Sequence, residues 1–449
     1  MISHHLAKMI KSILSAMKRK FVTLITFAYN IAKMNVRRGF INSIDEWIDT
    51  ENLKSLPFDC HPMGWYKTFV PEREIFNLDD RISRHCEFRL FNAIRWCLSR
   101  KVKIYYLANS YLVGQNAIVL SPDRRIFKQL TYPTSGRIWR YKDFLGKVIF
   151  PAASVRIGWY TSLTCPTSYN FFHWMIECLP RLAALEEYVP LFDGIVIPSN
   201  PQPFHRESLA ALGVGGDRLI EASPKLHLKV EHLFTTDYSA LDNPATWLHL
   251  WYKDKFIRPL NLKVKQGRKI YISRADASHR KVANSEEVHA MVSALGFEVI
   301  VLSRLSFIDQ AKLFYTSDVI VGEHGAGLAN LVFCRKGSKV IEIFSVFWIA
   351  PCCYAIARSA GLEYHVHVAE SAEVRSIAGK KIASAPIDGT LDECQSAEYS
   401  VDVDDLQKKI LAVIDTHSIS DQKIARPMAS DNFRLMGDDA CKEIERVCK

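Results

Sequence analysis

Apolar positions in the second half of the chain alternate between short β-branched runs and stretches at helical spacing. Strand-like runs are predicted at 269–274, 297–301, 318–322, 339–344 and 364–368, and helices at 285–295, 306–315 and 349–360. Continuous β-branched runs are typical of parallel strands that are buried on both faces. The pattern therefore predicts an α/β fold with a doubly wound domain over residues 268–415.

The first half shows a weaker version of the same alternation. Strands are predicted at 194–197, 218–220 and 232–234, and helices at 204–212 and after Pro244. Upstream of these, residues 45–150 lack a clear period, although 104–107, 111–113 and 117–120 indicate strands. We therefore predict a second Rossmann-like domain over residues 45–258 with an irregular, β-rich entry, joined through a linker at 259–267. Two domains also suit 449 residues, which are too many for one core.

Charge is concentrated at the N-terminus. Residues 1–44 contain eight Lys or Arg residues and no acid, whereas the rest of the chain holds 50 basic and 48 acidic residues. A nucleic-acid-binding body is therefore not indicated. The segment 1–44 shows an apolar stripe at helical spacing, which favours a basic amphipathic helix on an anionic membrane face. An ordinary helix packed on the protein, a transit peptide and a weak signal anchor remain alternatives. Residues 416–449 form a charged C-terminal tail.

Cysteine usage indicates the compartment. The chain has 11 cysteines, an odd number, without C-x-x-C pairs, and no N-x-Ser/Thr glycosylation acceptor. This pattern favours reduced thiols. We therefore expect a cytoplasmic protein, peripheral on the inner face of the plasma membrane if residues 1–44 bind lipid.

A glycine-containing loop follows the predicted strand 318–322. Gly322, Gly325 and Gly327 separate this strand from renewed apolar positions at helical spacing. Such a loop presents free N–H groups and the positive end of a helix dipole, which suit phosphate. The spacing G-x-x-G-x-G matches neither the dinucleotide fingerprint nor a P-loop. A plain strand–helix turn with a histidine near the cap is the alternative.

Basic residues follow another predicted strand. Arg274 ends the run at 269–274, and Arg280 and Lys281 come shortly after it. Ligands of open α/β sheets collect at the carboxyl ends of strands, where arginine and lysine suit an anion. Glu342 lies within a β-branched run, where either a pair of ribose hydroxyls or a strand-end salt bridge would satisfy its carboxylate.

A polar pair occurs in the apolar stretch 168–182. Asn170 is suited to cap a helix, and His173 and Glu177 are four residues apart, so they share one helical face. An imidazole beside a carboxylate can act as a general base. The alternative is a hydrogen-bonded pair on a buried helix. No third ligand or H-E-x-x-H motif accompanies the pair, so no metal site is predicted.

Together these motifs resemble glycosyltransferase family 61. The motifs are N-F-F-H-W-x-x-E-x-x-P-R-L from Asn170, Y-I-S-R ending at Arg274, R-K-V-x-N from Arg280, and G-x-H-G-x-G-x-x-N from Gly322. The resemblance covers roughly residues 150–350 and includes bacterial capsular polysaccharide proteins, plant xylan-decorating transferases and animal O-linked N-acetylglucosaminyltransferases. It implies a GT-B architecture, inversion at the anomeric carbon and no required metal.

The resemblance also implies roles for individual residues. His173 and Glu177 would face the acceptor as the catalytic pair, and Glu177 is preferred slightly as the base. Asn170, Trp174 and Arg181 would lie on the acceptor side. The donor-binding residues would be Arg274, Arg280, Lys281, Asn284, His324, Gly325, Ala326, Gly327, Asn330 and Glu342, of which Asn330 and Glu342 would fix the nucleoside. One departure is that Ser285 follows Asn284, where family members often carry Glu.

The expected activity is transfer of a sugar from a nucleotide sugar, with UDP as the favoured nucleotide. The acceptor would be a glycan or a lipid-linked glycan in surface polysaccharide synthesis, and no cofactor is expected. A nicotinamide-dependent oxidoreductase is one rival, but it should show G-x-G-x-x-G near residues 150–200. A non-catalytic sugar-nucleotide-binding protein is the other, and it would have no need for His173 and Glu177.

Overall fold

The computed structural model defines most of the chain between residues 40 and 415. The described residues are 40–41, 43–54, 64–69, 75–77, 96–98, 102–127, 130, 152–237, 246–345, 350, 352–369 and 398–415. The predictions on residues 1–39 and on the tail 416–449 therefore lie outside the described residues. The chain divides into two compact units, Met1–Gln407 and Lys408–Lys449, and both large sheets belong to the first.

A mixed sheet of nine strands forms the N-terminal half of the described chain. Its strands are β1 (Phe40–Ile41), β2 (Gly64–Phe69), β5 (Val102–Val113), β6 (Ile118–Leu120), β7 (Ile126–Phe127), β8 (Ser154–Ser162), β9 (Gly194–Ile197), β10 (Leu219–Glu221) and β11 (His227–Thr236). The order is β1-β7-β6-β5-β11-β8-β9-β10, with β2 beside β5. The segment β11-β8-β9-β10 is parallel, whereas β5 pairs antiparallel with β11, β2 and β6. A separate pair is formed by β3 (Ile75–Asn77) and β4 (Trp96–Leu98).

Short helices connect these strands. They are α2 (Ile44–Lys54), α6 (Phe171–His173), the π-helix η3 (Trp174–Cys178), α7 (Arg181–Ala184), η4 (Glu186–Leu191), α8 (Pro203–Ala211), η5 (Gly216–Arg218), α9 (Thr246–Tyr252), the π-helix η6 (Lys253–Ile257) and η7 (Arg258–Leu260). The side chains of Ile41 and Ile44 are buried beside Trp47 and Phe127. Residues before position 45 therefore contribute to the core of this sheet.

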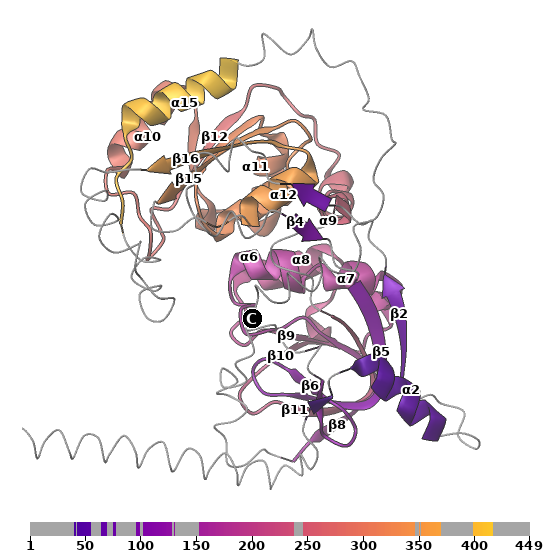
Figure 1. Cartoon of the computed structure of the whole chain (residues 1–449). Helices are drawn as coiled ribbons and strands as arrows, with labels where there is room; N and C mark the ends of the chain where they lie inside the picture. Colours follow the sequence, from indigo (N-terminus) through magenta and orange to yellow (C-terminus); the bar gives the residue numbers. More distant parts are fainter. Residues whose placement is uncertain are drawn as a thin grey trace, which may run out of the picture. The chain divides into compact units, whose positions relative to one another are not determined.

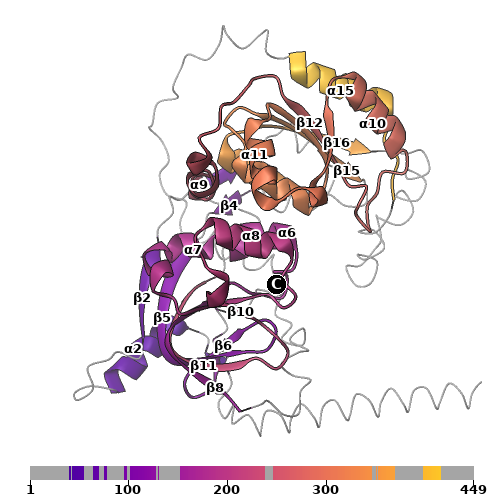
Figure 2. The same cartoon turned by 180° about the vertical axis from the view of Figure 1, so that it is seen from behind.

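The second sheet confirms the predicted βα alternation. Its five strands are β12 (Lys269–Ser273), β13 (Glu298–Val301), β14 (Val319–Glu323), β15 (Lys339–Ser345) and β16 (Glu363–Ala369), and all are parallel. Its helices are α10 (Ser285–Ala294), η8 (Leu302–Arg304), α11 (Phe307–Thr316), the 3₁₀-helix η9 (Ala326–Phe333) and α12 (Cys352–Ala360). The helix α15 (Val403–Asp415) crosses the boundary between the two units. Figures 1 and 2 show α10 on one face of the sheet and α11 and α12 on the other.

Strand order creates a switch point in this sheet. The order is β13-β12-β14-β15-β16, so the chain leaves β12 toward one edge and returns to pair β14 on the other side of β12. The loops after β12 and β14 therefore diverge, and the crevice between them is the usual ligand site in such sheets.

The helix η9 is the packing centre of this half. It packs against α6, α9, η6, α11 and α12. Phe333, which is fully buried, places its ring 5.3 Å from Tyr252 and 5.9 Å from Phe307. One apolar core thus joins the glycine loop to the helices that precede and follow it.

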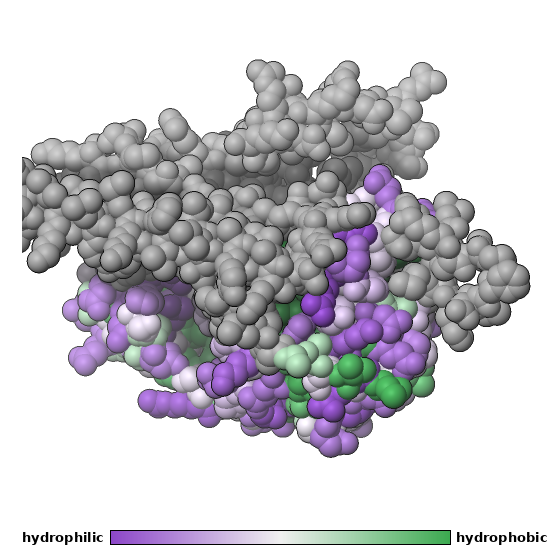
Figure 3. Space-filling view, turned by 90° about the horizontal axis from the view of Figure 1, so that it is seen from below, coloured by the Kyte–Doolittle hydropathy of each residue, from purple (hydrophilic) through white to green (hydrophobic). Residues whose placement is uncertain are grey.

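No helix among the described residues is both long and apolar enough to span a bilayer. The large apolar side chains that are exposed include Val155 and Ile157 in β8. Figure 3 shows a face on which small apolar patches are interrupted by hydrophilic residues.

Candidate active site

The predicted anion-binding residues meet at the switch point. Arg274 directly follows β12, and His324 and Gly325 directly follow β14, its neighbour in the sheet. The guanidinium of Arg274 lies against Gly325, where an added Cβ atom would overlap it. Gly325 has a φ of 174°, which any residue can adopt, so close approach rather than backbone strain requires the glycine.

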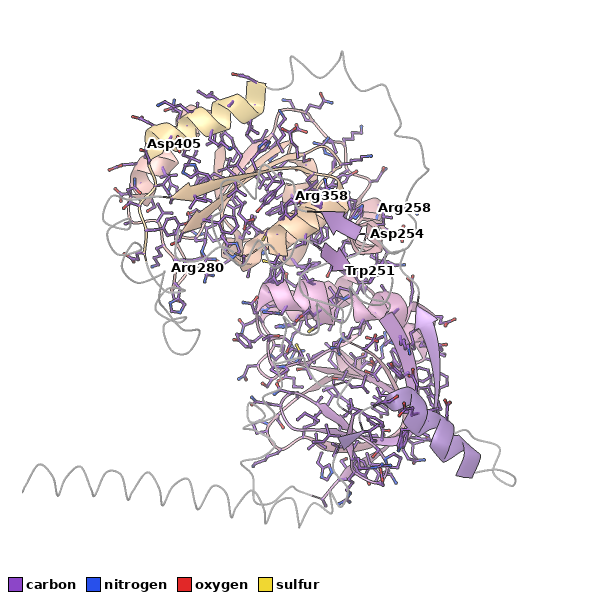
Figure 4. The ribbon with its side chains drawn as sticks, in the orientation of Figure 1. Trp251, Asp254, Arg258, Arg280, Arg358 and Asp405 are labelled. Carbon is purple, nitrogen blue, oxygen red and sulfur yellow. The ribbon has the colours of Figure 1, made fainter. Side chains whose placement is uncertain are left out.

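Two arginines, Arg274 and Arg280, gather at this switch point. Arg274 donates from Nη2 to the carbonyl oxygen of His279 at 3.0 Å, and its buried Nε has no hydrogen-bond partner among the described residues. Burial and the positive charge of Arg274 lower the pKa of Arg280. Arg280 also has a left-handed backbone, with φ of 53°. Figure 4 shows it on the side to which the arrowheads of β15 and β16 point. Such an arrangement of like charges is stabilised by an anion.

Glu323 holds Arg274 in place, and sequence reasoning missed it. Its buried carboxylate accepts from the Tyr271 hydroxyl at 3.0 Å and from the backbone N–H of Arg274 at 3.3 Å. Burial raises the pKa of Glu323. An acid at the end of a β-branched strand, directly before the glycine loop, was the signal in the sequence that could have identified it.

Tyr399 is a second residue that sequence reasoning missed. Its segment forms a parallel bridge to Val282, and its N–H donates to the carbonyl oxygen of Lys281 at 3.1 Å. Burial and the charge of Glu323 raise the pKa of Tyr399, while Arg274 and Arg280 act in the opposite direction. Tyr399 thus belongs to the same electrostatic neighbourhood, but it lies more than 100 residues after the motif at Arg280–Asn284 that it contacts, so no local pattern could reveal it.

Asn284 connects this segment to the loop after β12. Its Nδ2 donates to the carbonyl oxygen of Val401 at 2.9 Å, and its Oδ1 accepts from the N–H of Val401 at 2.9 Å. The side chain predicted to bind the donor is therefore engaged with backbone. Lys281, three residues earlier, is half-buried.

Asn330 also serves the scaffold. It is fully buried, and its Nδ2 donates to Gln310 Oε1 and to the carbonyl oxygen of Gly327, both at 2.9 Å. These bonds attach the first turn of η9 to α11. Gly325, Ala326 and Gly327 open η9, whose first turn offers the N–H groups that a helix leaves without internal partners.

Glu342 lies deeper than predicted. It is fully buried in β15, with Oε1 2.5 Å from His324 Nδ1, and its Oε2 accepts a hydrogen bond from the Tyr364 hydroxyl. Both oxygens are thus engaged within the protein, as in the salt-bridge alternative rather than the ribose alternative. His324, Glu342 and Cys353 are all residue types that can bind a metal ion, and their ligand atoms lie within 4.8 Å of one another.

His173 and Glu177 form the predicted pair, but on a π-helix. Asn170 Oδ1 caps α6 by accepting from the N–H of Phe172 at 2.9 Å. The chain then continues into η3, where the N–H of Leu179 donates to the carbonyl oxygen of Trp174 at 2.9 Å. His173 Nδ1 lies 2.9 Å from Glu177 Oε2, and the side-chain exposures are 23% and 1%. Short π-helical segments occur frequently at functional sites.

Trp174 and Arg181 are buried rather than open to an acceptor. Trp174 is fully buried and donates from Nε1 to Ser208 Oγ at 3.0 Å. Arg181 donates from Nε to the carbonyl oxygen of Glu177 at 3.1 Å and from Nη1 to that of Ser162 at 3.3 Å. The resemblance implied acceptor-side positions for both residues, whereas the structure buries Trp174 in η3 and Arg181 at the start of α7.

The pair and the anion site belong to adjacent elements. The helix α6, which ends at His173, packs against η9, which begins at Ala326. In addition, Glu207 on α8 accepts from the N–H of Phe307, the first residue of α11, at 2.6 Å. The half-buried His173 ends a helix that thus contacts η9, the helix that follows the glycine loop.

Comparison with known proteins agrees with this geometry. The family model described as Glycosyltransferase 61 matches residues 171–341, which confirms the predicted resemblance. The match contains every predicted site residue except Asn170 and Glu342, which lie one position outside it.

Characterised relatives match shorter stretches. The EGF domain-specific O-linked N-acetylglucosamine transferase of Mus musculus is 31% identical over 101 residues, 21% of this chain and 19% of that protein. The Beta-1,2-xylosyltransferase of Arabidopsis thaliana is 39% identical over 71 residues, 16% of this chain and 13% of that protein. The EGF domain-specific enzyme of Xenopus laevis is 33% identical over 90 residues, 19% and 17% of the two chains. The matches thus cover less than a fifth of the length of these relatives.

Proposed function

From the premise that residues 171–341 belong to glycosyltransferase family 61, we propose that this chain is an inverting, metal-independent glycosyltransferase of GT-B architecture. It moves a sugar from a nucleotide sugar, with UDP as the favoured nucleotide, to a glycan or lipid-linked glycan. Surface polysaccharide synthesis in the cytoplasm, at the inner membrane face, is the proposed setting. The observation that carries the proposal is the convergence of Arg274, Arg280 and the glycine loop at a switch point whose helix η9 packs against the helix bearing His173.

The proposed reaction is a single displacement. The pair of His173 and Glu177 removes the proton from an acceptor hydroxyl, and the oxygen attacks the anomeric carbon as the bond to the nucleoside diphosphate breaks. Arg274, Arg280, Lys281 and the N–H groups at the start of η9 stabilise the charge on the departing diphosphate. Because His173 Nδ1 and Glu177 Oε2 lie within hydrogen-bond distance, we assign the role of base to the pair rather than to one member.

The first test is ligand-induced thermal stabilisation of the full chain. UDP, GDP, CMP, dTDP and NAD are compared with and without EDTA, since a ligand at 100 times its Kd stabilises by about 2.7 kcal/mol. Stabilisation by one nucleoside diphosphate, unchanged by EDTA and lost in Arg274→Ala, is expected. Arg258→Ala is the matched control, because its side chain is 83% exposed and pairs with Asp254 (Figure 4). Stabilisation by NAD alone would favour an oxidoreductase instead.

The catalytic role of the polar pair has its own test. His173→Ala with Glu177→Ala should lower transfer at least about 100-fold, while nucleotide binding is retained. His365 and Glu363 form a second histidine–glutamate pair, at 2.9 Å in β16, and the corresponding double variant is the control. Retention of transfer in the first variant would show that another group is the base, whereas a wild-type chain that binds nucleotide but transfers no sugar would favour the non-catalytic binding protein.

A further inference from the structure

A buried carboxylate–imidazole contact lies directly behind the proposed donor site. Glu342 is fully buried in β15, and its carboxylate contacts the imidazole of His324, the hydroxyl of Tyr364 and the region of the Cys353 thiol. We propose, on the basis of the proposed function, that Glu342 is a positioning residue that keeps His324 as an imidazolium, and that His324 donates from Nε2 to the diphosphate of the donor. Glu342 then has no contact with the nucleoside.

Burial leaves the Glu342 carboxylate dependent on its protein partners. A carboxylate removed from water is stabilised only if it is paired with a cation or becomes neutral. Three described groups contact the Glu342 carboxylate: the His324 imidazole at 2.5 Å, the Tyr364 hydroxyl and the Cys353 thiol. Of these, the imidazole can carry a positive charge, whereas the hydroxyl and the thiol are neutral donors.

The surroundings fix the direction of the imidazole ring. The backbone N–H of His324 donates to the carbonyl oxygen of Ile343 at 2.8 Å, and its ring stacks on Phe344 with centroids 4.8 Å apart. With Nδ1 directed at Glu342, Nε2 is the ring nitrogen that remains for a ligand, and an imidazolium donates from both nitrogens. His324 is 8% exposed and precedes Gly325, against which the guanidinium of Arg274 lies. The cation from this pair thus adds to those of Arg274 and Arg280.

The distance argues against a metal ion held by the same side chains. Zinc bonds to nitrogen and oxygen are about 2.0–2.2 Å, which at a tetrahedral angle separates two ligand atoms by about 3.3 Å. His324 Nδ1 and Glu342 Oε1 are 2.5 Å apart, which is within hydrogen-bond distance and closer than two ligand atoms on one zinc ion. Cys353 is also a poor ligand here, because its pKa is raised by the neighbouring Cys352, by burial and by Glu342.

The binding test compares two probes, one for the diphosphate and one for the nucleoside of the donor. Inorganic pyrophosphate and uridine are titrated calorimetrically, in EDTA, into the full chain, Glu342→Gln and Glu363→Gln. We expect Glu342→Gln to weaken pyrophosphate binding about 10–100-fold and to leave uridine unchanged, whereas Glu363→Gln changes neither. Weakened uridine binding with intact pyrophosphate binding would assign Glu342 to the nucleoside and overturn the proposal. Stoichiometric zinc in the purified wild-type chain that is lost in Glu342→Gln would also overturn it.

A double-variant cycle shows whether Glu342 acts through His324. Glu342→Gln should cost little further pyrophosphate affinity when His324 is already Gln, because the two changes remove one interaction. Additive losses would contradict the proposal. If Glu342→Gln proves too unstable, Tyr364→Phe removes one donor to the same carboxylate and should give a smaller loss in pyrophosphate affinity that also disappears in His324→Gln.

The protonation of His324 supplies a readout that does not depend on sugar transfer. Side-chain ¹⁵N NMR should show both ring nitrogens protonated in the wild type and one in Glu342→Gln. A neutral His324 in the wild type would overturn the inference even if transfer is observed. A protonated ring in a chain that transfers no sugar would retain the ion pair and reject the proposed function, so the two failures are distinguishable.

Discussion

Single atoms at the switch point decide whether an anion can bind. Gly325 lacks the Cβ atom that would overlap the Arg274 guanidinium, and Glu323 accepts from the backbone N–H of Arg274. The glycine therefore sets the position of a cation that arises 50 residues earlier in the chain. Its backbone conformation is ordinary, so a substitution should alter binding more than stability.

Gly325→Ala should weaken UDP binding about 10–100-fold, because the displaced guanidinium loses charge-assisted bonds to phosphate that are each worth about 1.5–3 kcal/mol. The melting temperature should change by a few degrees at most. Calorimetric titration of UDP and a thermal melt measure the two effects. Gly216→Ala is the control, since nothing lies within 4 Å of its added Cβ and its φ is not positive. Equal UDP affinity in both variants would contradict the close-contact role.

His249 should make stability depend on pH. It lies on α9, 8% exposed, and burial followed by the charge of Lys253 lowers its pKa from 6.5 to about 4. Between these values the unfolded state binds the proton more strongly than the folded state. The stabilisation is therefore present above about pH 6.5 and is lost as pH falls toward 4, by about 3 kcal/mol at most.

Denaturant unfolding at pH 4.5–8 measures this dependence. His249→Phe should flatten the acid limb of the stability curve, whereas His365→Gln, on a more exposed histidine, should leave it in place. An unchanged acid limb in His249→Phe would show that other groups cause the loss.

At the scale of elements, the spacing of apolar residues in the sequence predicted where most strands of the second sheet lie, but it did not predict which type of helix forms. The β-branched runs could become nothing other than buried parallel strands, and β12 to β16 lie within a few residues of their predicted positions. By contrast, η3 is a π-helix and η9 a 3₁₀-helix. These helices differ from an α-helix by one residue in the spacing between the bonded N–H and C=O groups. Core packing decides that spacing, and it buries Trp174 and Arg181, two residues that the resemblance assigned to the acceptor side.

The contact between Asn284 and Val401 should keep two distant segments ordered. Asn284→Ala removes both bonds to the backbone of Val401, and the freed segment 398–402 should release the loop after β12. We expect faster hydrogen exchange in residues 280–284 and 398–402, and a KM for the nucleotide sugar raised about tenfold, with kcat nearly unchanged. Exchange that rises only at residues 284–287 would instead indicate loss of a local contact to Glu287.

At the scale of the whole molecule, strand order made the site, and the sequence did not reveal that order. Alternating β and α elements predict parallel strands but leave open which strand lies beside which. Because β14 pairs with β12 rather than β13, Arg274 and His324 share one crevice. The motifs indicated both residues, yet Tyr399 came to the same place through a contact that no motif encodes. The family match likewise ends at residue 341, one position before Glu342.

A truncation that tests whether the N-terminal segment binds membrane has to keep the described core residues. Ile41 and Ile44 are core residues, so a deletion of 1–44 would damage the sheet and mimic loss of targeting. Deletion of residues 1–36, or replacement of the basic residues before 39 by Gln, avoids that. Each basic residue near an anionic surface contributes about 1 kcal/mol, so both variants should move from the membrane to the soluble fraction at low salt. High salt should release the wild type in the same way.

Deletion of residues 416–449 is the control and should leave fractionation unchanged. If the full chain is already in the soluble fraction at low salt, the membrane proposal fails. If mass spectrometry shows that the mature protein lacks residues 1–44, the segment is a targeting peptide.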